Sequence, residues 1–232
     1  MTSTSAMTQT GVSIDKVRER IARAAKLAGR HPESVMLLAV SKTKPACAIR
    51  EAYAAGQGDF GENYLQEALD KQRELNDLPL IWHFIGPIQS NKTRAIAEQF
   101  DWVHSVDRLK IAQRLSEQRP PDLPPMQICL QVNISNEPSK SGCSPDELPT
   151  LMAEVNALPR LQLRGLMAIP DHSSEIELSK AFAAMQALLK TAQTDYLALD
   201  TLSMGMSADL ELAIRYGATI VRVGSDIFGA RN

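Results

Sequence analysis

The stretch Met36-Leu37-Leu38-Ala39-Val40-Ser41-Lys42-Thr43-Lys44-Pro45 passes from an apolar run to a lysine and then to a proline. Residues 36–40 have the length and composition of a short buried strand, and Pro45 suits the first turn of a following helix. In a (β/α)8 barrel the reactive groups lie at the carboxyl ends of the strands, which would place Lys42 at the barrel mouth. A partly desolvated amine there is suited to nucleophilic attack or Schiff-base formation. The alternative interpretation is a surface lysine just past a strand.

The alternation of apolar runs and helical periodicity continues on both sides of this stretch. We expect strands over 36–40, 59–63, 81–86, 102–106, 127–134, 163–169, 201–204 and 219–223, and helices over 14–27, 45–55, 64–75, 92–99, 108–118, 146–157, 177–192 and 209–216. Eight such units predict an α/β protein, a single (β/α)8 TIM barrel with an extra N-terminal helix. An open doubly wound sheet is the alternative, but the chain contains no GxGxxG or GxxxxGK[ST] motif.

Length and composition fit one domain of ordinary charge. The chain has 232 residues, the size of one barrel, and 44% of them are hydrophobic. We expect one domain over residues 12–232 and a disordered tail over residues 1–11, which lack the pattern of a secretory signal. The 25 basic and 27 acidic residues give a net charge of -2, so nucleic acid and anionic membranes are not indicated as partners.

Cysteine and histidine usage points to a cytoplasmic protein without a metal site. Cys47, Cys129 and Cys143 show no CxxC spacing, so neither a disulfide framework nor a zinc site is indicated. The four histidines, at positions 31, 83, 104 and 172, lack metal-ligand spacing. No apolar run approaches the roughly 20 residues that a membrane span requires.

Polar residues recur at the carboxyl ends of the expected strands, as they do in a barrel that carries a site. Two segments suit a phosphate group: Ser203-Met204-Gly205-Met206-Ser207 and Val223-Gly224-Ser225. The loops after strands seven and eight are the usual phosphate site of this fold, and glycine permits a close approach of the backbone. The alternative is that Ser207 is an ordinary helix cap and that the glycines form ordinary turns.

Arg222 lies in an otherwise apolar strand and therefore needs a dedicated partner, either a carboxylate such as Glu62 or a ligand atom. At the ring nitrogen of a pyridine it would keep that nitrogen unprotonated, which weakens a cofactor as an electron sink.

His83 is either functional or a satisfied structural histidine. Asn133 either binds a ring hydroxyl or caps a turn. The loop around Lys140 is either a solvated connection or a mobile lid.

Motifs spread over nearly the whole chain resemble those of the pyridoxal-phosphate homeostasis protein family, the YggS and PROSC group. The matching stretches are Leu37-Leu38-Ala39-Val40-Ser41-Lys42-Thr43-Lys44-Pro45, Phe60-Gly61-Glu62-Asn63-Tyr64, Trp82-His83-Phe84-Ile85-Gly86-Pro87-Ile88-Gln89-Ser90-Asn91-Lys92, Ser139-Lys140-Ser141-Gly142, Leu163-Arg164-Gly165-Leu166-Met167-Ala168-Ile169-Pro170, Leu202-Ser203-Met204-Gly205-Met206-Ser207 and Val221-Arg222-Val223-Gly224-Ser225. Met204, where leucine is common, and Ser225-Asp226, where threonine and a small residue are frequent, depart from the family pattern without removing a hydroxyl or a backbone donor.

The resemblance implies a barrel like the N-terminal domain of alanine racemase, with pyridoxal 5'-phosphate (PLP) held as a Schiff base on Lys42. It also implies that Arg222 lies near the pyridine nitrogen and that the phosphate is bound by residues after the last two strands. The full set of candidate cofactor-binding residues is Lys42, Asn63, His83, Met167, Ser203, Ser207, Arg222, Gly224 and Ser225.

Two function classes remain open at this point. A PLP-dependent amino-acid racemase needs two acid/base groups, and in alanine racemases the second is a tyrosine from an additional β domain of a partner subunit. No such domain follows Phe228, and of the four tyrosines only Tyr64 lies near a strand end. We therefore expect a protein that holds PLP and takes part in intracellular PLP homeostasis without robust turnover. It would exchange PLP with apoenzymes or free amino acids and would be a monomer.

Overall fold

The computed structural model describes residues 8–135, 137, 140–171 and 174–229 and has the expected fold class. The strands are β1 (Met36–Val40), β2 (Asp59–Glu62), β3 (Ile81–Phe84), β4 (Trp102–Val106), β5 (Met126–Gln131), β6 (Leu161–Met167), β7 (Thr201–Ser203) and β8 (Ile220–Val223). The α-helices are α1 (Gln9–Leu27), α2 (Ala46–Ala54), α3 (Leu65–Glu74), α4 (Thr93–Gln99), α5 (Leu109–Gln118), α6 (Leu148–Asn156), α7 (Glu175–Ala192), α8 (Leu210–Arg215) and α9 (Ser225–Phe228). Two 3-10 turns, η1 (Pro32–Ser34) and η2 (Ser90–Lys92), complete the order.

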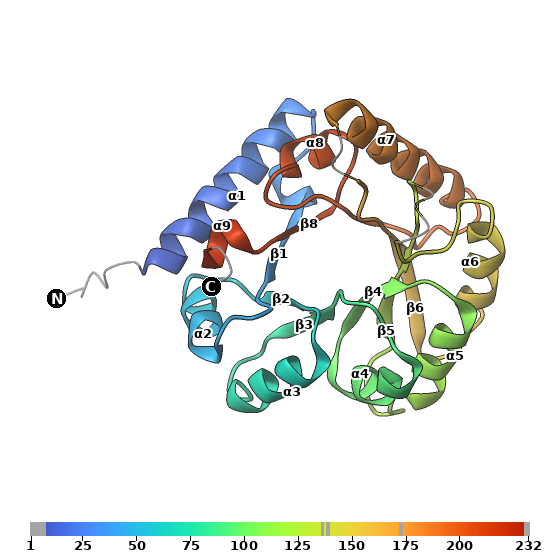
Figure 1. Cartoon of the computed structure of the whole chain (residues 1–232), viewed down its shortest axis with the longest axis horizontal. Helices are drawn as coiled ribbons and strands as arrows, with labels where there is room; N and C mark the ends of the chain where they lie inside the picture. Colours follow the sequence, from blue (N-terminus) through green and yellow to red (C-terminus); the bar gives the residue numbers. More distant parts are fainter. Residues whose placement is uncertain (1–7, 136, 138–139, 172–173, 230–232) are drawn as a thin grey trace.

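All eight strands are parallel and follow one another in sequence order around a closed barrel. Closure is made by β1 against β8, where Met36 pairs with Ile220 and Ala39 pairs with Val223. The helices form an outer ring around the strands (Figure 1). The predicted barrel is therefore confirmed, and the open-sheet alternative is excluded. Closure brings the first and last strands together, and the segments that follow them meet at one end.

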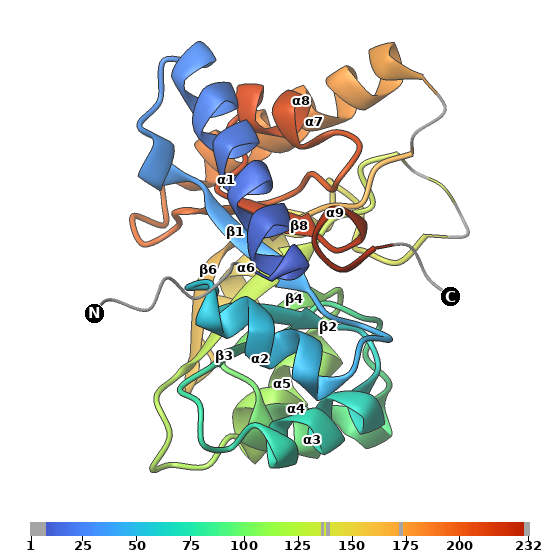
Figure 2. The ribbon, with the colours of Figure 1, turned by 90° about the vertical axis from the view of Figure 1, so that its left-hand side faces the viewer.

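The N-terminal helix α1 begins earlier than its apolar pattern predicts. The side chain of Thr8 accepts a hydrogen bond from the backbone N–H of Gly11, which caps the helix at Gln9. Residues 9–11 therefore belong to the helix, and the part of the expected tail over residues 1–7 lies outside the described residues. Ile14, Val17 and Ile21 bury the apolar face of α1. The helix packs against α8 and α9 and runs alongside β1 and β8 (Figure 2).

Strand five ends three residues before the expected boundary because its chain finds other partners. Val132 forms an isolated bridge with Cys143, and the backbone N–H of Asn133 donates to the Cys143 carbonyl. The side chain of Gln131 donates to the Ser141 carbonyl. Residues 132–133 thus pair with the later part of the loop and do not continue the sheet. The short elements η1, η2 and α9 were not predicted, since three or four residues carry no measurable periodicity.

Two apolar clusters stabilise the barrel. The larger lies between the strands and the helices and includes Phe60, Phe182 and Val103. The smaller contains Leu38, Val40, Ile85 and Ile220. Among the described residues, no helix is both long enough and apolar enough to cross a membrane.

Gly165 in β6 allows the tightest backbone approach in the barrel wall, and its substitution provides a test of the fold. A Cβ atom at this position would lie 1.8 Å from the carbonyl oxygen of Thr201, on the paired strand β7. We expect Gly165→Ala to lower the free energy of unfolding by about 2 kcal/mol or more in urea titrations, because backbone atoms would have to shift. Gly58→Ala is the control, since a Cβ there meets nothing within 4 Å. Equal stability of the two variants would contradict the described strand pairing.

Candidate functional site

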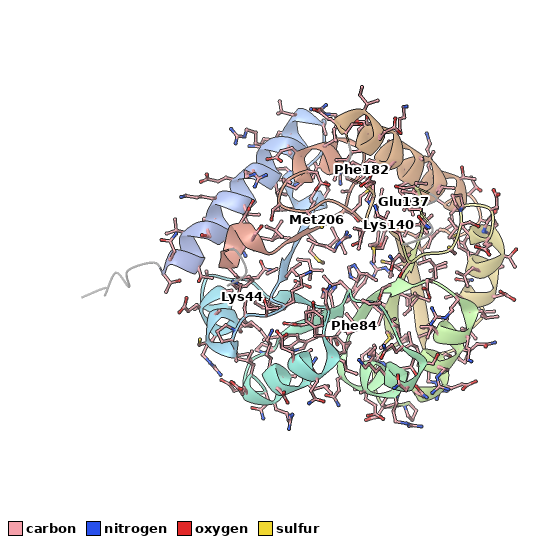
Figure 3. All side chains as sticks on the ribbon, in the orientation of Figure 1. Lys44, Phe84, Glu137, Lys140, Phe182 and Met206 are labelled. Atoms are coloured by element: carbon pink, nitrogen blue, oxygen red, sulfur yellow. The ribbon has the colours of Figure 1, made fainter. Side chains whose placement is uncertain are left out.

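A cavity of about 310 Å³ opens at the carboxyl end of the barrel, within the size range of small-molecule sites. Six of the nine candidate residues contribute to its wall: Lys42, Asn63, Ser207, Arg222, Gly224 and Ser225. The other lining residues are Val40, Thr43, Lys44, Ile85, Ile169, Met206, Ala208 and Gly229. Lys44 and Met206, from the segments after β1 and β7, are labelled in Figure 3. Residues at or just after the carboxyl ends of β1, β2, β3, β6, β7 and β8 thus meet around one hollow.

The charge of the cavity wall is one-sided. Among the described residues of the wall, Lys42, Lys44 and Arg222 are cationic, and none is an aspartate or a glutamate. The hydroxyl oxygens of Ser207 and Ser225 lie 3.1 Å apart. Cationic side chains and hydroxyl donors favour an anionic ligand, and a phosphate ester matches both. The cavity therefore has the chemistry of an anion-binding site with an amine at its edge.

Lys42 lies in a tight turn directly after β1 and is partly buried. The next residue, Thr43, has a φ of 63°, a left-handed conformation that is uncommon outside glycine. The backbone N–H of Thr43 donates to Oε1 of Glu67 at 2.6 Å, and the N–H of Lys44 donates to the Ser41 carbonyl at 3.0 Å. These bonds hold the strained turn and direct Lys42 to the cavity.

A buried ionic cluster of Lys71, Glu62 and Glu67 holds the residue before this turn, Ser41, from the side of α3. The ammonium group of Lys71 in α3 donates to the carbonyl of Ser41 and to Oε1 of Glu62, each at 2.7 Å, and also to Glu67. The Ser41 hydroxyl donates to the same Glu62 oxygen at 2.6 Å. Burial raises the pKa of the Glu62 carboxyl, and the positive charge of Lys71 opposes that rise. The cluster ties β1, β2 and α3 together one residue before Lys42.

Arg222 does not have the carboxylate partner proposed from the sequence. Glu62 binds Lys71, whereas the guanidinium of Arg222 donates to the Ser203 hydroxyl at 2.8 Å and to the Ala168 carbonyl at 2.9 Å. Glu62 is paired with Lys71 because the lysine side chain reaches it from the neighbouring helix α3. Burial lowers the pKa of Arg222 to about 10, and the charge of Asp209 opposes that shift. Arg222 thus stays cationic at neutral pH, with two of its five N–H donors used in these bonds.

The remaining candidates, His83, Met167 and Ser203, are fully buried and do not line the cavity. The rings of His83 and His104 lie in contact, with Nδ1 of His83 2.9 Å from Nε2 of His104. The Ser203 hydroxyl contacts Arg222 and His104, so it supports the arginine instead of facing the hollow. Both ring nitrogens of His83 have hydrogen-bond partners, Asp59 and His104.

Asn133 and Lys140 have local structural partners. The side chain of Asn133 donates to the carbonyl of Glu137 at 2.9 Å, which is the turn-capping alternative. Lys140 forms an ion pair with Glu137 at 2.7 Å. Both residues of this pair lie beside α7, away from Lys44 (Figure 3). Tyr64 is exposed, and no tyrosine is among the described residues of the cavity wall.

Arg20 in α1 is a supporting residue that sequence reasoning missed. Its guanidinium donates to the Ser207 carbonyl at 2.9 Å, to both carboxylate oxygens of Glu211 and to Asp226 at 2.5 Å. These bonds clamp the segment after β7 to the helix after β8, which carry the two serines of the cavity wall. No local pattern marks Arg20, because its partners lie up to 206 positions away.

The family model described as "Alanine racemase, N-terminal domain" matches residues 12–232. The chain is 66% identical over 221 residues to the pyridoxal phosphate homeostasis protein of Pseudomonas aeruginosa, covering 95% of each chain. It is 55% identical over 227 residues to the protein of the same description in Escherichia coli, covering 95% of this chain and 96% of the relative. The chain belongs to the pyridoxal phosphate homeostasis protein family. The resemblance read from its motifs is thereby confirmed.

Solved structures agree with this assignment. The family member PipY of Synechococcus elongatus, solved with PLP bound, is 44% identical, with a TM-score of 0.80 over 92% of this chain and 100% of PipY. Alanine racemase of Corynebacterium glutamicum is 17% identical, with a TM-score of 0.67 over 94% of this chain and 61% of that enzyme. At that identity the racemase shares the fold alone, and this member of the homeostasis family spans less than two thirds of its length.

The cluster behind the lysine turn is tested by removing its cation. We expect Lys71→Met to lower the free energy of unfolding by about 3 to 5 kcal/mol at pH 7, because it leaves the Glu62 carboxylate buried and uncompensated. The loss should shrink as the pH falls toward the ordinary carboxyl pKa of 4.5, since the protonated acid tolerates burial. Urea titrations at both pH values measure the effect.

Arg73→Met on the same helix is the matched control, because its partner Asp70 forms an exposed ion pair worth less than about 1 kcal/mol. Adding Glu62→Gln to Lys71→Met should restore part of the loss. If Lys71→Met is as stable as Arg73→Met, the cluster does not anchor the turn.

Proposed function

We propose that this protein binds PLP in the cavity at the carboxyl end of its barrel and takes part in PLP homeostasis. The supporting observation is the cavity wall itself, whose described residues include three cationic side chains, two adjacent hydroxyls and no carboxylate. PLP supplies an aldehyde, which condenses with an amine to form a C=N bond and release one water. The amine, the anion-binding hydroxyls and a permanent donor for the ring thus lie around one hollow of matching size.

The cofactor-binding roles follow from position in the wall. Lys42 provides the amine, on the turn that Glu67 and Lys71 hold in place. Ser207 and Ser225 provide hydroxyl donors for the phosphate, and Gly224 lets the chain approach the end of β1 closely, since a Cβ there would lie 3.0 Å from the Val40 carbonyl oxygen. Arg222 would donate to the ring nitrogen of PLP. Because a guanidinium donates and does not accept, this contact would favour an unprotonated nitrogen.

The fit to a carrier is better than the fit to a racemase. Two-sided proton transfer needs a second acid/base group opposite Lys42, and neither tyrosine nor histidine is among the described residues of the wall. An arginine at the pyridine nitrogen also weakens the cofactor as an electron sink. Relatives bear the name of homeostasis proteins, although proteins that share the fold are enzymes. The proposed setting is cytoplasmic, with PLP-dependent apoenzymes and free amino acids as exchange partners and a monomeric protein.

The attachment residue is tested by trapping. After PLP loading and borohydride reduction, peptide mass spectrometry should place the pyridoxyl group on Lys42, and Lys42→Ala should abolish the visible absorption of the loaded protein. Lys44→Ala is the matched control, because Lys44 also lines the cavity but should leave the labelling unchanged. A label found only on Lys44 or on Lys140 would refute the assignment.

The function class is tested by turnover. Loaded protein incubated with a panel of L-amino acids should show no efficient racemisation, because neither a tyrosine nor a histidine is among the described wall residues to act as a second acid/base group opposite Lys42. Chiral chromatography of the amino acids measures the outcome. In parallel, transfer of PLP to an apoenzyme is read from that enzyme's recovered activity. Efficient racemisation that depends on Lys42 would overturn the carrier role.

A further inference from the structure

A continuous chain of polar side chains crosses the interior of the barrel, where such folds normally place branched apolar residues. Nε2 of His83 lies 3.1 Å from Oδ1 of Asp59, and its Nδ1 lies 2.9 Å from Nε2 of His104. Nδ1 of His104 lies 2.8 Å from the hydroxyl of Ser203, to which Arg222 donates at 2.8 Å. The five residues come from β2, β3, β4, β7 and β8. Both histidines and the serine are fully buried.

The chemistry of the donors fixes the direction of every bond in this chain. Arg222 can only donate, so the oxygen of Ser203 accepts its hydrogen and the serine's own proton is directed to His104. Burial is the main cause that holds the pKa of His104 well below 6.5, and the positive charge of Arg222 acts in the same direction, so this ring is neutral. Accepting at Nδ1, it carries its hydrogen on Nε2 and donates to Nδ1 of His83. His83 in turn carries its hydrogen on Nε2 and donates to the Asp59 carboxylate.

The reversed arrangement is less favourable. If His83 donated to His104 from Nδ1 while it also donated to Asp59 from Nε2, the ring would be a buried cation. His104 would then donate from Nδ1 to Ser203, whose hydroxyl would lose its acceptor. A buried hydroxyl donor without an acceptor is unfavourable. The forward arrangement pairs every proton with an acceptor and leaves both rings neutral.

The two end residues of this hydrogen-bonded series, Arg222 and Asp59, lie at opposite ends of the barrel. Arg222 lines the cavity proposed for PLP, whereas Asp59 begins β2 and lines a separate hollow at the amino ends of β1 and β2, together with Met36, Gly58, Arg18 and Glu33. The carboxylate of Asp59 is 22% exposed, so solvent reaches that end. Among the described residues, Asp209 and Cys129 are titratable groups that act electrostatically on Arg222. Trp102 stacks on His83 at 5.4 Å.

We propose that Asp59, His83 and His104 are positioning residues that hold Ser203 and, through it, Arg222 in one orientation below the cofactor cavity. The hydrogen bonds run from Arg222 to Asp59, so the Asp59 side chain is the last acceptor and fixes the direction of every donor before it. Loss of any link lets the Ser203 hydroxyl rotate and removes a fixed acceptor from Arg222. The effect on PLP rests on the proposed function, but the direction of the chain does not.

The direction is tested on the full-length protein without added PLP. Long-range proton–nitrogen correlation spectra of histidine-labelled protein at pH 7 should show His83 and His104 both neutral, with the hydrogen on Nε2 and Nδ1 unprotonated. His31→Asn, a change at an exposed histidine outside the barrel, identifies the signals of His31 and should leave the signals of His83 and His104 unchanged. A hydrogen on Nδ1 of either ring, or a doubly protonated His83, overturns the proposed direction.

The positioning role is tested by PLP titration of variants. His104→Phe keeps a ring but removes both bonds, and we expect the dissociation constant for PLP to rise about tenfold and the absorption maximum of the bound cofactor to shift. Val103→Ala is the matched control, because the neighbouring residue belongs to the outer core and its loss destabilises the barrel without touching the chain. Equal PLP affinity and spectrum in the two variants overturns the role.

Two substitutions of Asp59, whose side chain is partly exposed, are less disruptive than a change at the buried His104. They test the role even if His104→Phe fails to fold. Asp59→Asn retains an acceptor for His83 and should behave as the original protein, whereas Asp59→Leu removes it and should weaken PLP binding and shift the spectrum in the direction of His104→Phe. Identical behaviour of the two Asp59 variants contradicts the proposal. Failure of the unaltered protein to bind PLP would overturn the proposed function, and the nitrogen spectra would still decide the direction of the chain.

Discussion

The pairing of β1 with β8 is the constraint on which the site depends. Four residue pairs, from Met36 with Ile220 to Ala39 with Val223, close the sheet and leave no free edge. Because the strands are parallel, closure also sets the turn after β1 beside the turn after β8. Gly224 approaches the Val40 carbonyl so closely that a Cβ would lie only 3.0 Å from it. The amine of Lys42 and the hydroxyl of Ser225 therefore line one cavity although they are separated by nearly the whole chain.

Polar groups stabilise this mouth from two sides. On the outside, α3 supplies Lys71, which holds the turn before Lys42, and α1 supplies Arg20, which holds the segments that carry the serines. On the inside, Arg222 rests on Ser203 and the histidines. A buried charge that is paired or hydrogen-bonded can fix geometry even where it adds little net stability. Around this site, buried polar side chains occupy positions that apolar residues could fill, and they hold the hydrogen-bond donors in a defined arrangement.

Most of the fold could be predicted from the sequence because its pattern is local. The bounds of β1 and β4 match the expected ranges, since β1 is an apolar run that ends before Ser41 and β4 is bounded by Asp101 and Asp107. Errors occur where tertiary contacts override the pattern. The strand expected to reach residue 134 ends at Gln131, because Val132 bridges to Cys143. The first helix starts at Gln9, because Thr8 caps it. Neither partner is visible as periodicity.

The sequence by itself determined the eight alternating units, the family and most of the polar residues at the strand ends. Only the tertiary structure decided which of them face the cavity. His83, Met167 and Ser203 share the strand-end pattern of Arg222 but lie buried away from the wall. Likewise, Glu62 binds Lys71 and not Arg222, and the partners of Arg20 lie about 190 to 206 positions away. Sequence spacing describes neighbours along a strand or helix, whereas hydrogen-bond partners across a closed barrel are fixed by strand order, register and the direction in which each side chain points.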